Sequence, residues 1–150
     1  MAQLGLKKIF RGPTTYTNTA SDVEGVGTLR FEGNQLWKWV KFTGTTAVTA
    51  GDPIYYVVTD LTLSTVDDAI SVLPAGIAPV SIAAGTPTWG WIQLEGTATL
   101  SNTPSGTLAA GVTLTKGSTA GTLAAQTAAT QPSIGTSVDG AKTIQCDFTW

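Results

Sequence analysis

The sequence predicts an all-β protein, a small antiparallel β-sandwich or barrel with an extended N-terminal arm. Thr, Ala and Gly account for 62 of the 150 residues, and only 12% of the residues are charged. Short apolar runs recur about every ten residues and are separated by Gly, Pro, Asn or Asp, as in sandwiches and barrels. Surface helices need charged side chains on their solvent face, and this chain has few of them.

Residues 1–27 are expected to form the arm, and residues 28–150 a single β-domain. The arm holds no sustained period of 2 or 3.6 residues and contains the polar run TTYTNTASD. Residues 1–41 carry a net charge of +3 and residues 42–150 a net charge of −5. The asymmetry favours two interpretations equally: an arm that meets an acidic partner surface, or a solvated tail.

The domain is expected to hold about eight to ten short strands. The predicted strands are 28–33, 36–42, 51–60, 76–85, 89–96 with a continuation through TATLS, 111–117, 119–125, 132–138 and 142–150. Pro79 lies inside the fourth of these strands. Proline cannot donate a ladder hydrogen bond, so that strand is expected at an edge or with a bulge. Residues 119–132 are low in complexity and are alternatively a loose loop.

An Ala–Gly pair recurs before several predicted strands. It occurs in TAGDPI (49–54), AAGTPT (83–88) and AAGVTL (109–114). Glycine allows the positive φ that many tight turns require. Repeated use of the same turn chemistry is favoured over internal duplication.

The residue inventory argues against an enzyme and against any cofactor or metal site. The chain has no His, which removes Ser–His and Cys–His catalysis and His-based metal sites. Cys146 is the only cysteine, so the chain has no internal disulfide and is expected to fold in a reducing cytosol. Asp67–Asp68 is interpreted as a solvent-facing hairpin turn.

Nucleotides, nucleic acid and membranes are not expected partners. The sequence Gly25–Val26–Gly27 is not followed by the Lys–Ser/Thr pair of a phosphate loop. Three acidic residues partly offset the positive charge of the six basic residues in the first 41 positions, and the overall pI is acidic. No apolar run approaches the roughly 20 residues of a membrane span, and the N-terminus lacks the order of a signal peptide.

Two predicted strands are apolar on both faces. LWKWVKF places Trp37 and Trp39 on one face, and WGWIQLEG does the same with Trp89 and Trp91. A strand of this kind has both faces buried, either within a larger sandwich or against another chain. At least half of the rings are expected to be ordinary core, and the others interface anchors. Trp150 is expected to tuck into the fold or into a neighbour.

Two stretches resemble decoration, or cement, proteins of tailed-bacteriophage heads. They are AGDPIYYV (50–57) and GIAPVSIAAGTPTWGWIQLEGTATL (76–100), and the resemblance covers roughly residues 47–117. It implies a viral structural protein on the virion capsid surface, often trimeric, that binds the lattice of the major capsid protein and stabilises the head.

A tail or head-fibre module that binds a receptor or glycan is the alternative function, because exposed tryptophans suit both. A homotrimer is expected, since it would bury aromatic side chains near its axis. The residues expected at a protein interface are Lys7, Lys8, Phe10, Arg11, Trp37, Trp39, Trp89, Trp91 and Trp150.

Overall fold

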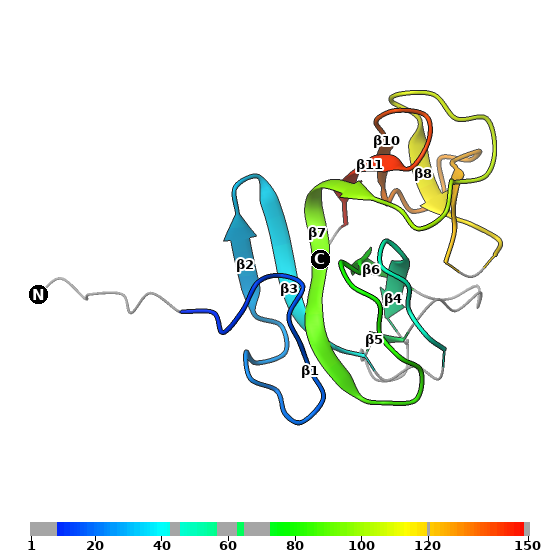
Figure 1. Cartoon of the computed structure of the whole chain (residues 1–150). Helices are drawn as coiled ribbons and strands as arrows, with labels where there is room; N and C mark the ends of the chain where they lie inside the picture. Colours follow the sequence, from blue (N-terminus) through cyan, green and yellow to red (C-terminus); the bar gives the residue numbers. More distant parts are fainter. Residues whose placement is uncertain (1–8, 43–45, 57–62, 65–72, 120, 149–150) are drawn as a thin grey trace, which may run out of the picture.

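The computed structural model describes residues 9–42, 46–56, 63–64, 73–119 and 121–148. These residues form strands and no helix, which confirms the all-β prediction (Figure 1). The strands are β1 (Thr17–Asn18), β2 (Leu29–Glu32), β3 (Gln35–Phe42), β4 (Pro53–Tyr56), β5 (Leu63–Ser64), β6 (Leu73–Ile77), β7 (Thr88–Thr99), β8 (Thr113–Lys116), β9 (Leu123–Ala125), β10 (Gly135–Ser137) and β11 (Thr143–Asp147).

The long strand β7 organises the fold, because it pairs with four other strands. Pairings β3–β5, β5–β4, β4–β6, β6–β7 and β7–β3 close a ring, and all except β3–β5 are antiparallel. Single residue pairs complete the ring, Phe42 with Leu63 and Ile77 with Gln93. The second half of β7 pairs with β11, and the sheet continues through β10, β8 and β9 (Figure 1).

The predicted strand at 76–85 is wrong in its position. β6 ends at Ile77, and Pro79 lies in a bend just after it. The ladder with β4 ends where proline removes the next amide donor. Beyond the bend, only an isolated bridge between Val48 and Ile82 remains. Every other predicted strand contains an observed one or differs from it by one residue at its start, while β1 and β5 have no predicted counterpart. Asp67–Asp68 lies outside the described residues.

The repeated Ala–Gly pairs are turns, as the sequence suggests. Gly51, Gly85 and Gly111 have φ angles of +91°, +72° and +84°. In the first turn, the amide of Asp52 donates to the carbonyl of Thr49 at 2.9 Å. The three turns precede β4, β7 and β8. Glycine is required there because other residues rarely adopt positive φ.

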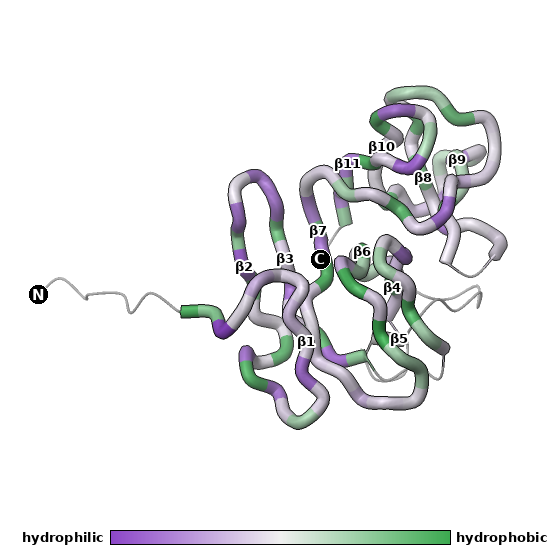
Figure 2. Tube along the Cα trace, viewed as in Figure 1, coloured by the Kyte–Doolittle hydropathy of each residue, from purple (hydrophilic) through white to green (hydrophobic). Residues whose placement is uncertain are grey.

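β3 and the first half of β7, residues 88–94, are largely buried on both faces, as their alternating pattern predicts. One face of each strand joins the main core, which gathers side chains from β3, β4, β6 and β7 and from the C-terminal strands. Its largest fully buried side chains are Tyr55, Phe42, Leu36, Ile54, Ile92, Leu94, Leu114, Leu123 and Ile134. Hydrophilic residues mark the tip of the β2–β3 hairpin, away from this core (Figure 2). The other face of β3 and β7 carries the tryptophans.

Candidate interface around the tryptophan cluster

Three tryptophans form a second, separate cluster on the face of β3 and β7 that points away from the main core. Trp37, Trp39 and Trp91 are 5%, 0% and 1% exposed. Trp39 and Trp91 meet edge to face, with ring centroids 5.2 Å apart. This geometry is favoured by the ring quadrupoles. The sequence correctly placed these rings on one face, but that face is not open to solvent.

Residues 10–24 of the same chain, here termed the cover segment, bury this cluster. Phe10 contacts Trp91 edge to face at 5.5 Å, and Tyr16 stacks on Trp39 at 6.2 Å. Val23 also packs against the cluster, and β1 pairs with the start of β7. The sequence predicts that residues 1–27 form an extended arm. From Phe10 onward, however, this segment lies against the sheet and covers the second apolar face of β3 and β7.

A carboxylate fixes the cover segment to the cluster. The indole Nε1 of Trp39 donates to Asp22 Oδ1 at 2.7 Å, and the amides of Gly25 and Val26 each donate to the same carboxylate at 2.8 Å. Partial burial acts to raise the pKa of Asp22, but these hydrogen bonds and the backbone of Glu24 together lower it. The ionised carboxylate is thus the form that stabilises this loop.

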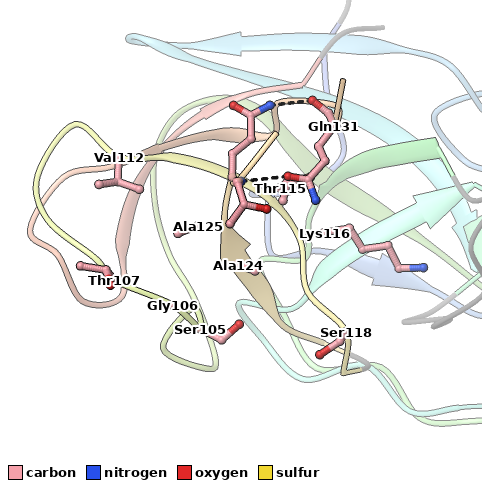
Figure 3. Close-up of a pocket in the computed structure, with 12 residues that line it drawn as sticks. Ser105, Gly106, Thr107, Val112, Thr115, Lys116, Ser118, Ala124, Ala125 and Gln131 are labelled. Carbon is pink, nitrogen blue, oxygen red and sulfur yellow. Dashed lines mark hydrogen bonds between the residues drawn. The ribbon is translucent and has the colours of Figure 1, made fainter. Parts of the chain in front are cut away.

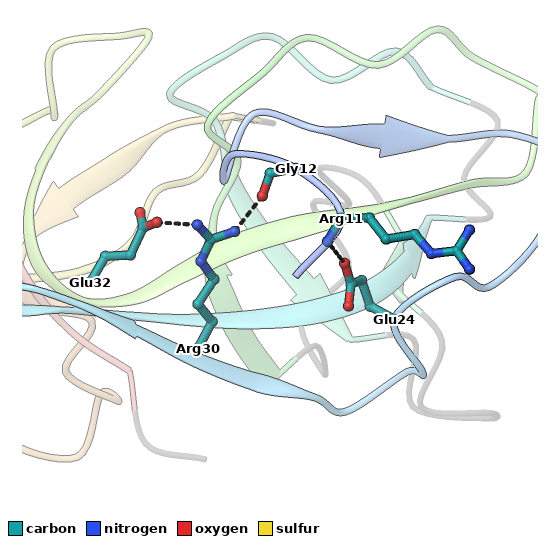
Figure 4. A network of polar contacts seen from close by, with 5 residues as sticks. All are labelled: Arg11, Gly12, Glu24, Arg30 and Glu32. Atoms are coloured by element: carbon teal, nitrogen blue, oxygen red, sulfur yellow. Dashed lines mark hydrogen bonds and ion pairs between the residues drawn. The ribbon is translucent and has the colours of Figure 1, made fainter. Parts of the chain in front are cut away.

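A polar network holds the start of the cover segment (Figure 4). The amide of Arg11 donates to Glu24 Oε1 at 2.7 Å, and Glu24 is buried. Arg30 on β2 donates to the carbonyl of Gly12 and forms an ion pair with Glu32. The guanidinium of Arg30 therefore joins the cover segment to the β2–β3 hairpin.

The same guanidinium also closes the edge of the aromatic cluster. Its centre lies 4.9 Å from the ring centroid of Phe10 and 5.7 Å from that of Trp91. Within the described part of the chain, the buried Nε1 atoms of Trp37 and Trp91 have no hydrogen-bond partner. Each unpaired donor costs about 1–3 kcal/mol. The cluster is therefore held by ring burial and by the Asp22 contacts, rather than by complete hydrogen bonding.

The remaining residues expected at an interface lie in different places. Trp89 is half-buried, and Lys41 Nζ lies 5.1 Å from its ring centroid. The side chain of Arg11 is exposed. Lys7, Lys8 and Trp150 lie outside the described residues. Of the predicted set, the structure brings together Phe10, Trp37, Trp39, Trp89 and Trp91.

The sequence analysis missed one conspicuous surface residue. Phe31 on β2 is 74% exposed. The alternation in TLRFEG could have identified it, because Phe31 occupies the face opposite its charged neighbours Arg30 and Glu32. It also missed the anchoring role of Asp22, because a contact between Asp22 and Trp39 has no local sequence pattern.

An open pocket lies beside β8 and β9 (Figure 3). Its lining contains hydroxyl and amide side chains and Lys116, but no aromatic residue. Gln131 Oε1 accepts the amides of Thr127 and Ala128, and Gln126 donates to the carbonyl of Gln131 at 2.6 Å. Those amide groups already have partners within the chain. With no ring for a sugar to stack on, the pocket does not resemble a glycan site.

Among the described residues, no group of three or more Asp, Glu or Cys side chains is placed to hold a metal ion. A membrane-spanning helix is likewise absent from the described part of the chain.

Comparisons with known proteins identify a fold but no family. No family model and no curated protein matches the sequence. One solved structure that shares the fold is the N base of head fiber gp8.5 in bacteriophage phi29. The chain is similar to it. The TM-score is 0.51 at 15% sequence identity, and the match covers 74% of this chain and 94% of the phi29 chain. At this identity the likeness concerns the fold alone.

Proposed function

We propose that this chain is a structural protein of a bacteriophage head, a decoration protein that binds the major capsid protein lattice at the capsid surface and stabilises the head. The observation that carries the assignment to a phage head is the fold shared with the N base of a head fibre over 94% of that chain. The resemblance of residues 47–117 to head decoration proteins supports the same assignment from a likeness in sequence.

The residue chemistry supports a binding role without a reaction. The chain has no His, and its described acids form no metal-binding group. The thiol of Cys146 is buried, and burial raises its pKa to about 12, so it is not a nucleophile near neutral pH. Ser–His, Cys–His and metal-assisted hydrolysis each need one of these groups, whereas a structural protein needs none of them.

The homotrimer expected from the sequence stays a prediction. The trimer is expected because the sequence shows no cover for the strand faces that carry the tryptophans. In the structure, the cover segment of the same chain buries the tryptophan cluster. Among the described residues of the predicted interface set, Arg11 is exposed, and Phe10 and Trp89 are half-buried. They are the candidates for contact with the capsid.

The second candidate function is the base of a head fibre. The phi29 protein with this fold is itself the base of a head fibre, and that observation favours this candidate specifically. A fibre base and a decoration protein would both attach to the capsid. They differ in whether attachment strengthens the shell.

The test uses capsids that lack this protein. Purified protein is mixed with them, and binding is measured by co-sedimentation with and without a chelator. A decoration protein binds in both conditions and raises the temperature at which the capsid disassembles. Attachment without any gain in capsid stability would favour the fibre base. No attachment to any head would refute both candidates.

A matched pair of charge reversals locates the contact. Arg11→Glu and Lys142→Glu each reverse one exposed positive charge, and only the first lies on the cover segment. We expect Arg11→Glu to weaken binding and to reduce its salt dependence, because opposite charges across an interface set the association rate. Lys142→Glu should bind normally.

A further inference from the structure

β2 lies at the outer edge of the sheet. It begins the strand order and pairs only with β3 among the described strands. In Figure 1 it forms the outer side of the β2–β3 hairpin. An edge strand presents backbone donors and acceptors that another strand can use.

The register identifies which backbone groups face outward. Glu32 pairs with Gln35 across a two-residue turn, and the amide of Trp39 donates to the carbonyl of Thr28 at 2.8 Å. In an antiparallel pair, hydrogen-bonded positions alternate along the strand. Thr28, Arg30 and Glu32 therefore direct their backbone groups toward β3. Leu29 and Phe31 direct theirs away from the sheet.

β2 is short and Arg30 points inward, which limits pairing, but other protections of an edge are missing. Natural edge strands carry Lys, Pro or a bulge that discourages pairing. The sequence of β2 is LRFE, and its pairing with β3 is regular over all four residues. Its two charges have opposite signs and already attract each other, as the Arg30–Glu32 ion pair shows. Its outward-facing position Phe31 is 74% exposed.

We propose that β2 binds a second copy of this chain by antiparallel edge-to-edge pairing about a twofold axis at Phe31. In this register Phe31 faces Phe31 of the second copy. Arg30 faces Glu32 of the second copy, and Glu32 faces its Arg30. The contact is isologous, because the same four residues serve both sides.

The order of the charged residues along β2 favours a second copy of this chain as the partner. The strand reads Arg, Phe, Glu around its centre, so reversing its direction brings opposite charges together. A parallel arrangement would bring Arg to Arg and Glu to Glu, which is unfavourable. The opposed phenylalanines add an aromatic cross-strand pair. No foreign strand needs to be assumed to match this pattern.

The association is weak, because four residues on each side form a small contact. Interfaces below about 1,200 Å² belong to weak and transient complexes. A weak contact is still effective between copies held close together, where the effective concentration reaches millimolar values. The pairing itself does not depend on the proposed function.

The first test is the mass of the full chain in solution. Sedimentation equilibrium between about 10 μM and 1 mM is expected to show a monomer–dimer equilibrium. Phe31→Glu places two like charges opposite each other and should weaken dimerisation at least tenfold. Phe31→Pro removes the outward amide and should do the same. Val138→Glu is the matched control, since Val138 is also an exposed apolar residue and lies beyond the end of β10. It should dimerise like the wild type.

The second test is site-specific crosslinking. Directly opposed, hydrogen-bonded positions in an antiparallel pair have Cα atoms about 5.5 Å apart, which lies within disulfide range. Phe31→Cys should therefore oxidise to a covalent dimer much faster than the control Val138→Cys. Cys146 is buried and does not compete.

Three outcomes would overturn the proposal. One is a monomer at every concentration with equal crosslinking of both cysteine variants. Another is a trimer that Phe31→Glu leaves unchanged. The third is a monomer whose capsid binding is lost in Phe31→Glu, which would assign this edge to a capsid protein. Far-UV circular dichroism of each variant establishes that the fold is intact, as expected for a side chain that is 74% exposed.

Discussion

Replacing Trp91 with alanine tests whether the tryptophan cluster belongs to the protein's own core. Trp91 is 1% exposed and lies between Phe10 of the cover segment and Trp39 of β3, with ring centroids 5.5 and 5.2 Å away. Removing the ring therefore leaves a cavity between two layers of the same chain. Trp89→Ala is the natural comparison, because Trp89 is on the same strand and face but only half-buried.

The expected cost of Trp91→Ala follows from burial. Large aromatic-to-alanine changes in a packed core cost about 3–5 kcal/mol of unfolding free energy. The total unfolding free energy of a domain is about 5–15 kcal/mol, so the variant loses a large fraction of its stability. With a urea dependence of about 2 kcal/mol per M, the unfolding midpoint falls by about 1.5–2.5 M. No hydrogen bond is lost among the described residues, since Trp91 Nε1 has no partner there.

Urea unfolding followed by far-UV circular dichroism measures this change, because tryptophan fluorescence would itself be altered. Trp91→Phe keeps a ring and removes the unpaired N–H, so its cost should stay below about 2 kcal/mol. Trp89→Ala loses partial burial and the contact with Lys41, about 0.5–1 kcal/mol for such a cation–π pair. If Trp91→Ala left stability unchanged but abolished capsid attachment, the ring would be serving a partner, and its assignment to the core would be wrong.

Four further changes test other parts of the structure. Removing residues 1–27 should lower the melting temperature, because the cover segment buries the tryptophan cluster. Asp22→Asn should destabilise the protein at neutral pH. The folded-state pKa of Asp22 is lowered, so its contribution is complete above the ordinary aspartate pKa and is lost as pH falls through the lowered value. Cys146 should react with a thiol reagent only as fast as the protein unfolds, because burial raises its pKa to about 12. Gly51→Ala should cost more than Gly85→Ala, for which about 1–2 kcal/mol is expected from positive φ alone. A Cβ at Gly51 would lie 2.4 Å from a backbone nitrogen, whereas Gly85 has open space.

Controls and contrary results are specific to each change. An unchanged melting temperature after removal of residues 1–27 would mean that the cover segment adds no stability. Asp147→Asn also removes an exposed carboxylate, from β11, and should leave the melting temperature at neutral pH unchanged. Rapid labelling of Cys146 in the native state would contradict its burial, and equal costs at the two glycines would contradict the close backbone approach at Gly51.

Local chemistry is what the sequence determined well. Alternation in β3 and β7 separated the tryptophans from the aliphatic residues because side chains on a strand point to opposite faces by simple geometry. Ala–Gly pairs predicted turns because glycine alone adopts positive φ freely. The scarcity of charged residues argued against surface helices, and the described residues form none.

Only the tertiary structure decided what covers the second face of those strands. The sequence required a cover for Trp37, Trp39 and Trp91, but it left open whether another chain or this one supplies it. The cover segment shows no periodic pattern of apolar residues. It is held by ring contacts and by Asp22, which pairs with an indole 17 residues away in sequence. The sequence also did not reveal that β2 lies at an edge, because strand order is set by pairings between residues distant along the chain. Such long-range choices depend on how much apolar surface each arrangement buries, and no local pattern of residues records that.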